Sequence, residues 1–429
     1  MAPSSSASDP KSQAGKLARE AETLAAAPSD TVALARVAAA IEELGNRSLA
    51  ARAFDALAAS AREDGQFALA AFAAVALIHL GDEKGGRAAN AALAEAYAQG
   101  SKRVDNKRRT RPPAPPARAS KEGDADAEAA ATDDPQVAMK AASAAIDEAA
   151  AHAALQTKKA GPLPAVPLIA ALDAASLGEL LGVMEPISKK AGEVVVEVGE
   201  DARSLYLIAR GTLAVSRDGQ ELGRLGAGAF FGEIALLSGA RRTARVAVVD
   251  DAWLLEVPHE GLEKAAAKAP ALADVLARYA RARLLANTMR TSDLFSRLEP
   301  AEREQLMPRF QPHVLAPGDK ALTAGEEGDR LHVIVSGDVE VSQGERVLAQ
   351  LGAGAVFGEM SLLGRRPASA DVVARTRTVT LSLDRAGFDD IAVKRPELLA
   401  EVYKLLVARE AENRKADQPY EVQPEDIVV

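Results

Sequence analysis

The residues best suited to binding chemistry in this sequence form one segment, FGEIALLSGARRTARV, from Phe231 to Val246. Arg242 carries a planar fork of hydrogen-bond donors, which suits an anion with several oxygens. A short helix is predicted to begin near Glu233, and the first N–H groups of a helix also suit an anion. Taken singly, each residue has a simpler explanation. Two adjacent arginines such as Arg241 and Arg242 usually lie on a solvated face, and a glutamate at a helix start stabilises the dipole.

That segment lies inside an internal repeat. GEVVVEVGEDARSLYLIARGTLAV, from Gly192, aligns with GDKALTAGEEGDRLHVIVSGDVEV, from Gly318. LGAGAFFGEIALL, from Leu225, aligns with LGAGAVFGEMSLL, from Leu351, at the same offset of 126 residues. Short alternating runs such as SLYLIA and RLHVIV, separated by glycines and charged turns, predict β-strands. The constant offset therefore predicts two copies of one β fold.

Two further features recur with the repeat. Gly211 and Gly337 are predicted to close a tight turn after the strands LYLIA and LHVIV. A helical stretch follows each copy, over Ala269–Met289 and over Pro396–Lys415.

The segment from Phe231 closely resembles the phosphate-binding cassette of cyclic nucleotide-binding domains. That family includes regulatory subunits of cAMP-dependent protein kinase, cyclic nucleotide-gated channels and bacterial catabolite-activator-type regulators. The FGE motif, its spacing to the arginine, and the hydroxyl residue and alanine that follow carry the resemblance, which extends over roughly residues 161–415. It implies that the ligand-binding residues of the first copy are Phe231, Gly232, Glu233, Ile234, Ala235, Arg242, Thr243 and Ala244.

The resemblance also implies a role for each polar position. Arg242 would bind the exocyclic phosphate oxygens, because a buried phosphate charge is costly without a positive partner. Glu233 would accept a hydrogen bond from the ribose 2′-hydroxyl, and Gly232 would let the backbone lie against the sugar. Thr243 would donate to the phosphate. In this family a threonine here can also reach the guanine amino group, so both cAMP and cGMP are candidate ligands.

The following helix supplies the candidates for covering the purine base. It is expected to close over the ligand, with Tyr279 or Leu284 as the cap.

The second copy departs from the pattern at the arginine. FGEMSLLGRRPASADV keeps Gly358 and Glu359, but the 126-residue offset places Ala368 opposite Arg242. Ser369 takes the place of the threonine. We therefore expect this copy to bind cyclic nucleotide weakly or not at all, with Gly358, Glu359 and Ser369 as a residual site.

Two arginines in the second copy lie close to the missing one. Arg365 and Arg366 come three and two residues early, so either would need a shift of the loop to reach a phosphate. Pro367 stiffens that loop and opposes the shift.

The N-terminal part is alanine-rich with helical periodicity. Gly45 and Gly81 each separate two apolar helical stretches, and their offset of 36 residues fits two degenerate tetratricopeptide-type hairpins. A plain helical bundle fits as well, because alanine-rich helices match almost any helical repeat. A basic, proline-rich segment (102–123) and an acidic segment (124–134) follow, neither able to bury a core.

The predicted fold is a multidomain α+β protein. It has an N-terminal all-α region followed by two jelly-roll β-barrels with flanking helices. The predicted domains are residues 1–13 disordered, 14–100 helical, 101–160 linker with a helix over 135–157, 161–289 first copy, 290–416 second copy and 417–429 tail.

Composition excludes several functions. The net charge of −9 argues against a DNA-binding protein. The chain has no cysteine, and its five histidines lack ligand spacing, so no metal site is expected. The N-terminus lacks a signal core, and the longest apolar run, Phe67–Leu80, is too short to span a bilayer. These features predict a soluble cytoplasmic protein without membrane contact. No nucleophile–base pair is visible, so neither an enzyme nor a cofactor is expected.

The leading hypothesis is a non-enzymatic sensor of cAMP or cGMP whose N-terminal helices hold a protein partner. The alternative is a regulatory subunit of a cyclic nucleotide-dependent kinase, although the basic stretch Lys107–Thr110 is a poor inhibitor segment. A catabolite-activator-type transcription factor would need a helix-turn-helix after the β fold. A scaffold with two non-binding copies is the remaining hypothesis.

Overall fold

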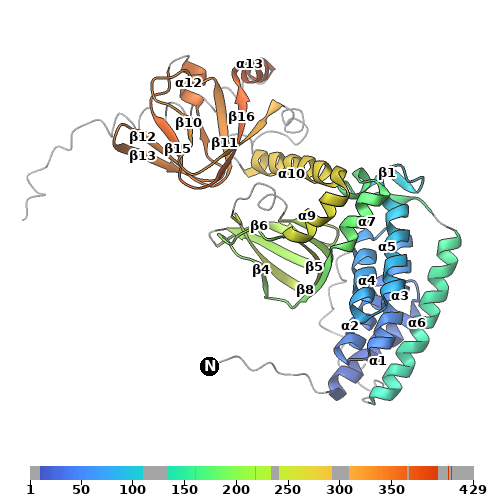
Figure 1. Ribbon diagram of the computed structural model, residues 1–429. Coiled ribbons are helices and arrows are strands. Elements are labelled where there is room, and N and C mark those ends of the chain that lie inside the picture. The colour runs from blue at the N-terminus through green and yellow to red at the C-terminus, as the bar shows by residue number, and fades with distance from the viewer. Residues whose placement is uncertain are drawn as a thin grey trace, which may run out of the picture. The chain divides into compact units, whose positions relative to one another are not determined.

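The computed structural model describes residues 10–109, 134–159, 161–217, 219–232, 241–291, 309–364 and 367–394, with Lys404 and Val407 (Figure 1). The chain divides into two compact units. The first holds the N-terminal helices and most of a first β domain, up to Leu276, and the second continues from Ala277. The short segments 199–202 and 241–243 group with the second unit.

The N-terminal region is helical, as expected (Figure 1). Asp30, Asn46 and Asp82 begin helices by accepting hydrogen bonds from first-turn N–H groups. Each helix packs on the next in the chain, and the last one, beyond the acidic segment, packs back on the first and third. The helices are α1 (Pro10–Ala26), α2 (Thr31–Glu43), α3 (Arg47–Glu63), α4 (Phe67–Leu80), α5 (Glu83–Tyr97) and α6 (Pro135–Lys158).

The 36-residue offset corresponds to two helix–turn–helix pairs, α2–α3 and α4–α5. Gly45 and Gly81 stand between the helices of each pair with φ of 76° and 102°, a conformation that favours glycine after a helix end. The tetratricopeptide-type interpretation and the domain boundaries stay predictions. The helix α6 adds to the helical packing although it was placed in the linker.

An aromatic cluster joins these helices to the first β domain. Trp253, on strand β8 (Arg245–Pro258), stacks on Phe72 of α4 at 4.7 Å between ring centroids with 5° between the planes. Phe54 of α3 lies 5.8 Å from the same indole. Every residue of α4 from Phe67 to Leu77 is buried, because this helix contacts α3, α5 and strands of the β domain.

Domain A is the first β domain. Its strands are β3 (Glu185–Lys189), β4 (Val194–Val196), β5 (Ser204–Arg217), β6 (Gln220–Leu225), β7 (Phe230–Phe231) and β8. They pair antiparallel in the order β3-β8-β5-β6, with β4 on β8 and β7 on β5. Ile208, Leu213 and Leu254 lie at the centre of the core. Helix α7 (Ala174–Gly182) precedes the strands, and α9 (His259–Lys268) and α10 (Pro270–Thr291) follow them.

Domain B is the second β domain and consists of two antiparallel four-stranded sheets. The sheets run β10-β15-β12-β13 and β14-β11-β16-β9. Both domains are jelly-roll-like, as predicted, although the sheets are not closed barrels. The strands are β9 (Gln311–Leu315), β10 (Lys320–Leu322), β11 (Arg330–Ser336), β12 (Val339–Gln343), β13 (Arg346–Leu351), β14 (Val356–Phe357), β15 (Asp371–Ala374) and β16 (Thr378–Asp384), followed by α13 (Arg385–Lys394). The helix expected over residues 396–415 lies almost wholly outside the described residues.

Gly211 and Gly337 occupy the same repeat position but have different places in the strands of the two domains. In domain A, β5 runs without interruption through Gly211, where the register to β8 shifts. A Cβ on Gly211 would lie 2.8 Å from Ala252, and its φ is 95°. The predicted tight turn at Gly211 is therefore wrong, because this glycine bends a continuous strand. In domain B, Gly337 separates β11 from β12.

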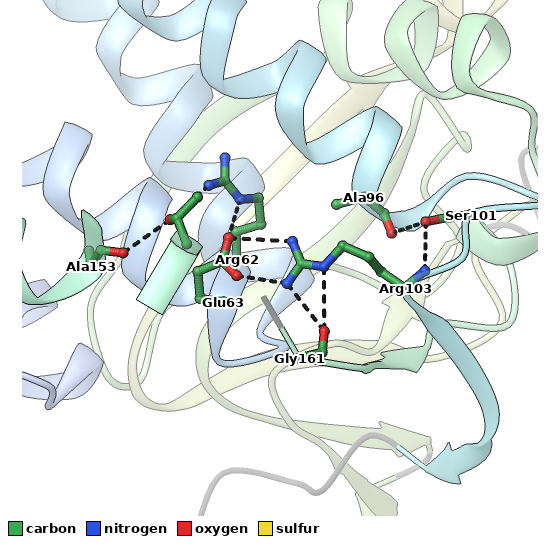
Figure 2. A network of polar contacts seen from close by, with 8 residues as sticks. Arg62, Glu63, Ala96, Ser101, Arg103, Ala153 and Gly161 are labelled. Carbon is green, nitrogen blue, oxygen red and sulfur yellow. Dashed lines mark hydrogen bonds and ion pairs between the residues drawn. The ribbon is translucent and has the colours of Figure 1, made fainter. Parts of the chain in front are cut away.

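Part of the expected linker is a strand. β1 (Val104–Arg109) pairs in parallel with β2 (Leu163–Ala165), so the two ends of the linker lie side by side. Figure 2 shows the polar network beside this pair. Arg103 Nη2 lies 2.7 Å from Glu63 Oε2, and the same guanidinium donates to the carbonyl oxygen of Gly161. Burial alone would raise the pKa of Glu63, but hydrogen bonds from Arg103 and Arg62 outweigh it and lower the pKa.

Of the helices in the described ranges, none is long and apolar enough to cross a membrane.

Candidate functional site

The first half of the predicted site begins at the end of β7. Phe231 pairs with Tyr206 of β5, and the two rings stack with centroids 5.0 Å apart and planes at 16°. The hydroxyl of Tyr206 donates to Glu256 Oε1 at 3.1 Å, which fixes the ring. Gly232 follows with φ of 89°, so the chain leaves the strand in a conformation that favours glycine. Glu233, Ile234 and Ala235 lie outside the described residues.

The second half of the site is centred on Arg242, whose backbone is held on both sides. Its N–H donates to the carbonyl of Glu200 at 2.9 Å, and its own carbonyl accepts from Gly199 N–H at 2.9 Å. Arg242 is buried, with 6% of its surface exposed. Arg241 is exposed, and its Nε lies 3.9 Å from Asp201 Oδ1. The solvated-face explanation of the arginine pair therefore applies to Arg241 and fails for Arg242.

The remaining predicted residues of domain A are partly buried. Thr243 and Ala244 lead into β8 and are both half-buried. On α10, Tyr279 is half-buried and accepts a hydrogen bond from Arg283 Nη1 at 3.4 Å. The guanidinium of Arg283 lies 5.8 Å from the centre of that ring. The side chain of Leu284 lies outside the described residues.

Domain B repeats the backbone of the Arg242 position without its side chain. Ala368 N–H donates to the carbonyl of Glu326 at 2.8 Å, and Gly325 N–H donates to the carbonyl of Ala368 at 2.8 Å. These are the same two hydrogen bonds, displaced by 126 residues. Ala368 is buried as well. The structure therefore places Ala368 at the position that Arg242 has in domain A.

The other predicted residues of domain B differ in burial. Glu359 is 1% exposed and begins the short helix α12 (Glu359–Gly364), while the helix predicted to begin near Glu233 lies outside the described residues. Ser369 is exposed. The structure gives Gly358 a reason that sequence analysis missed, because a Cβ there would lie 2.3 Å from the carbonyl oxygen of Arg330 on the next strand. Arg365 and Arg366 lie outside the described residues.

A pair of histidines in domain B was also missed. His332 stacks on Phe357 at 4.8 Å with 3° between the planes, as Tyr206 stacks on Phe231 in domain A. Burial, and then the charges of His313 and Arg330, lower the pKa of His332 to about 4. The signal that could have found it is its repeat position opposite Tyr206. In the described part of the chain, no three histidine, aspartate or glutamate side chains group as metal ligands.

The comparison with known families identifies both β domains. The cyclic nucleotide-binding domain family matches residues 186–269 and residues 312–395. These two segments are cyclic nucleotide-binding domains. The match covers the strands of domain A and domain B and ends in the helix after each, so the duplication read from the sequence is confirmed.

Relatives of this chain include kinases and kinase regulators. The cGMP-dependent protein kinase egl-4 of Caenorhabditis elegans is 30% identical over 217 residues, which are 49% of this chain and 27% of that protein. The cAMP-dependent protein kinase regulatory subunit of Yarrowia lipolytica is 29% identical over 211 residues, which are 48% of this chain and 54% of that protein. The chain thus spans about a quarter to half of the length of these relatives.

A solved structure of the regulatory domain of Toxoplasma gondii PKA with cAMP is 24% identical. The similarity covers 57% of this chain and 92% of that chain, with a TM-score of 0.28. At that score the overall superposition carries no argument about function.

Proposed function

We propose that domain A binds a cyclic nucleotide, cAMP or cGMP, and that the chain is a non-enzymatic sensor that passes the ligand state to a protein partner. One observation carries the proposal. Arg242 is buried and held by two backbone hydrogen bonds at the position where the family's motif has its phosphate-binding arginine, while the adjacent Arg241 is exposed.

The chemistry of a cyclic phosphodiester explains why this arginine matters. The ligand carries one negative charge that must leave water, and a buried charge without a partner is strongly unfavourable. A guanidinium matches two phosphate oxygens at once and stays charged at every physiological pH. Thr243 would add a hydroxyl donor, and Glu233 would recognise the ribose 2′-hydroxyl.

Domain B is proposed to bind cyclic nucleotide weakly or not at all. The same backbone position carries Ala368, so no guanidinium extends from it. Removing one partner of a buried charge pair costs roughly 2–5 kcal/mol, or about 30-fold to several thousandfold in affinity. Domain B would then serve as structure or as a surface for another protein.

Transmission of the ligand state requires an element with two states. The helix α10 follows domain A directly in the chain, and the ligand can shift its position only if it binds one arrangement better than the other. Tyr279 and Leu284 on this helix stay the proposed caps over the base.

A regulatory subunit of a cyclic nucleotide-dependent kinase is the second candidate. The resemblance to the Yarrowia lipolytica regulatory subunit, over 48% of this chain, favours it. A catalytic subunit that co-purifies with the chain and is released by cyclic nucleotide would support this candidate. The location in the cytoplasm stays a prediction.

The test is isothermal titration of the full chain with cAMP and with cGMP. We expect about one site per chain, with affinity reduced about 30-fold or more in Arg242→Ala. Arg241→Ala is the matched control, since it removes the same charge one residue away from an exposed side chain, and it should bind as the wild type does. Equal binding by wild type and Arg242→Ala, or no binding of either nucleotide, would contradict the proposal and favour a scaffold.

A further inference from the structure

A charged cavity of about 440 Å³ lies within the first unit, away from the segment that carries the FGE motif. Helices α1 and α2 form one side, and strands β3, β5 and β8 of domain A form the other. Five basic side chains line it, Lys16, Arg36, Lys189, Lys190 and Arg210.

Most of these charges are neutralised by carboxylates. Glu43 lies 3.1 Å from both Lys16 and Lys190, and Lys190 also lies 3.1 Å from Asp251. These contacts close one part of the cavity wall with an ion-pair network. Lys16 and Lys190 are therefore already paired with carboxylates and are poor candidates for binding a ligand.

Arg210 is different. Its guanidinium lies 5.4 Å from the centre of the Trp253 ring, and among the described residues it makes neither a hydrogen bond nor an ion pair. Burial, and then the charge of Arg36, lower the pKa of Arg210, although the charges of Glu20 and Asp251 act in the opposite direction. Arg36 itself has only a long contact, at 3.9 Å, to Glu20.

Four acidic side chains, Glu20, Glu42, Glu43 and Asp251, also line the cavity, one fewer than the basic side chains. Burial raises the pKa of Glu42, and the neighbouring charge of Glu43 raises it further. Two guanidinium groups remain with unused donors in a half-enclosed space.

We propose that this cavity binds the phosphate group of a small molecule, with Arg210 and Arg36 as its donors. A tetrahedral phosphate has enough acceptor oxygens for two guanidinium forks, whereas one carboxylate fills a single fork. The site belongs to the helical region and domain A alone. At the equivalent positions of domain B stand Ser336 and Val379 in place of Arg210 and Trp253.

Trp253 supplies the readout, because it is the only tryptophan of the chain and Arg210 lies over its ring. The experiment titrates the full chain with inorganic phosphate and follows the tryptophan fluorescence, with chloride at matched ionic strength as the reference. We expect a saturable change with phosphate and none with chloride. The absence of a saturable change up to millimolar phosphate overturns the proposal, and stronger binding of citrate than of phosphate overturns the choice of ligand.

Substitutions distinguish phosphate binding in this cavity from binding at the cyclic nucleotide site. Arg210→Ser introduces the residue found in domain B, and Arg36→Ser changes the opposite wall on a helix surface. Each should weaken phosphate binding about tenfold or more. Arg87→Ser, at an exposed ion pair on α5, is the matched control and should bind phosphate normally. Circular dichroism checks that each variant is folded.

The Arg242→Ala variant decides which site the phosphate occupies. We expect it to keep the phosphate response, because Arg242 does not line the cavity. A response that survives Arg36→Ser and Arg210→Ser, or that disappears in Arg242→Ala, would overturn the assignment.

Discussion

Domain A and domain B share a backbone framework that repeats hydrogen bond by hydrogen bond. In domain A, Gly192 N–H donates to Val248 at 2.8 Å, and in domain B, Gly318 N–H donates to Ala374 at 2.7 Å. The stacked pair Tyr206–Phe231 likewise has its counterpart in His332–Phe357. Glycines that allow positive φ, and apolar residues that fill the same core, are enough to preserve this framework.

The polar chemistry of the two domains differs at the positions that would act on a ligand or a partner. Arg242 becomes Ala368, which removes the cation of the site. Trp253, which joins domain A to the helices, becomes Val379. A duplicated fold can thus keep its framework while individual polar side chains change, because backbone geometry and side-chain function depend on different residues.

The largest expected effect is on the free energy of unfolding and compares Trp253 of domain A with Val379 at the same repeat position of domain B. Trp253→Ala should lower the free energy of unfolding by about 3–5 kcal/mol, because it leaves a cavity between α4 and the sheet. Val379→Ala, the same repeat position in domain B, removes fewer buried atoms and should cost less. Urea unfolding followed by circular dichroism compares the two. Equal costs would mean that the aromatic cluster does not stabilise the first unit.

The next effect concerns acid stability, which should depend on domain B. His332 is neutral in the folded chain because burial, and then His313 and Arg330, lower its pKa from 6.5 to about 4. The unfolded chain binds the proton more readily, so the stability contributed by neutral His332 is complete above pH 6.5 and is lost as the pH falls toward 4. The loss should reach about 3 kcal/mol.

His332→Phe tests this pH dependence, since phenylalanine keeps the stacking on Phe357 and cannot titrate. Urea unfolding at pH 7.5 and at pH 4.5 should show a smaller loss of stability in the variant than in the wild type. His259→Phe is the control at an exposed histidine and should leave the loss unchanged. A wild-type loss that persists in His332→Phe would place the acid sensitivity elsewhere.

A smaller effect tests whether Gly358, the glycine of the FGE motif in domain B, contributes to the stability of the fold. Gly358→Ala should be less stable than Gly344→Ala by about 1–3 kcal/mol, because a Cβ at Gly358 meets the carbonyl of Arg330 while Gly344 faces open space. Both glycines have positive φ, so the backbone strain is common to the two variants. Thermal unfolding measures the difference. Equal stabilities of the two variants would mean that Gly358 has no special role in the stability of the fold.

The smallest expected effect is a gain of function in domain B. Ala368→Arg restores the cation on a backbone that already has the required hydrogen bonds, and it should strengthen binding of cyclic nucleotide to domain B about tenfold. Titration of the Arg242→Ala background isolates that site. Ala368→Gln is the control of similar length without charge. No gain with arginine would mean that domain B has lost more than the arginine.

The fold class, the duplication and the register of the two copies could all be predicted from the amino-acid sequence. The 126-residue offset needed no structure, because glycines and apolar residues recur at fixed positions when a backbone is duplicated. It also located Arg242 and its replacement by Ala368. The helix expected over residues 135–157 is present as α6, Pro135–Lys158.

Which of two adjacent arginines is buried could not be predicted from the sequence and follows from the packing of the folded chain. Arg241 and Arg242 are identical in type, yet Arg241 is exposed and Arg242 is buried, with its backbone hydrogen-bonded to Gly199 and Glu200 about forty residues earlier in the chain. The same holds for the cavity at Arg210, which requires helices and strands far apart in sequence. Burial and unused donors depend on long-range packing, and no local pattern of residues encodes that packing.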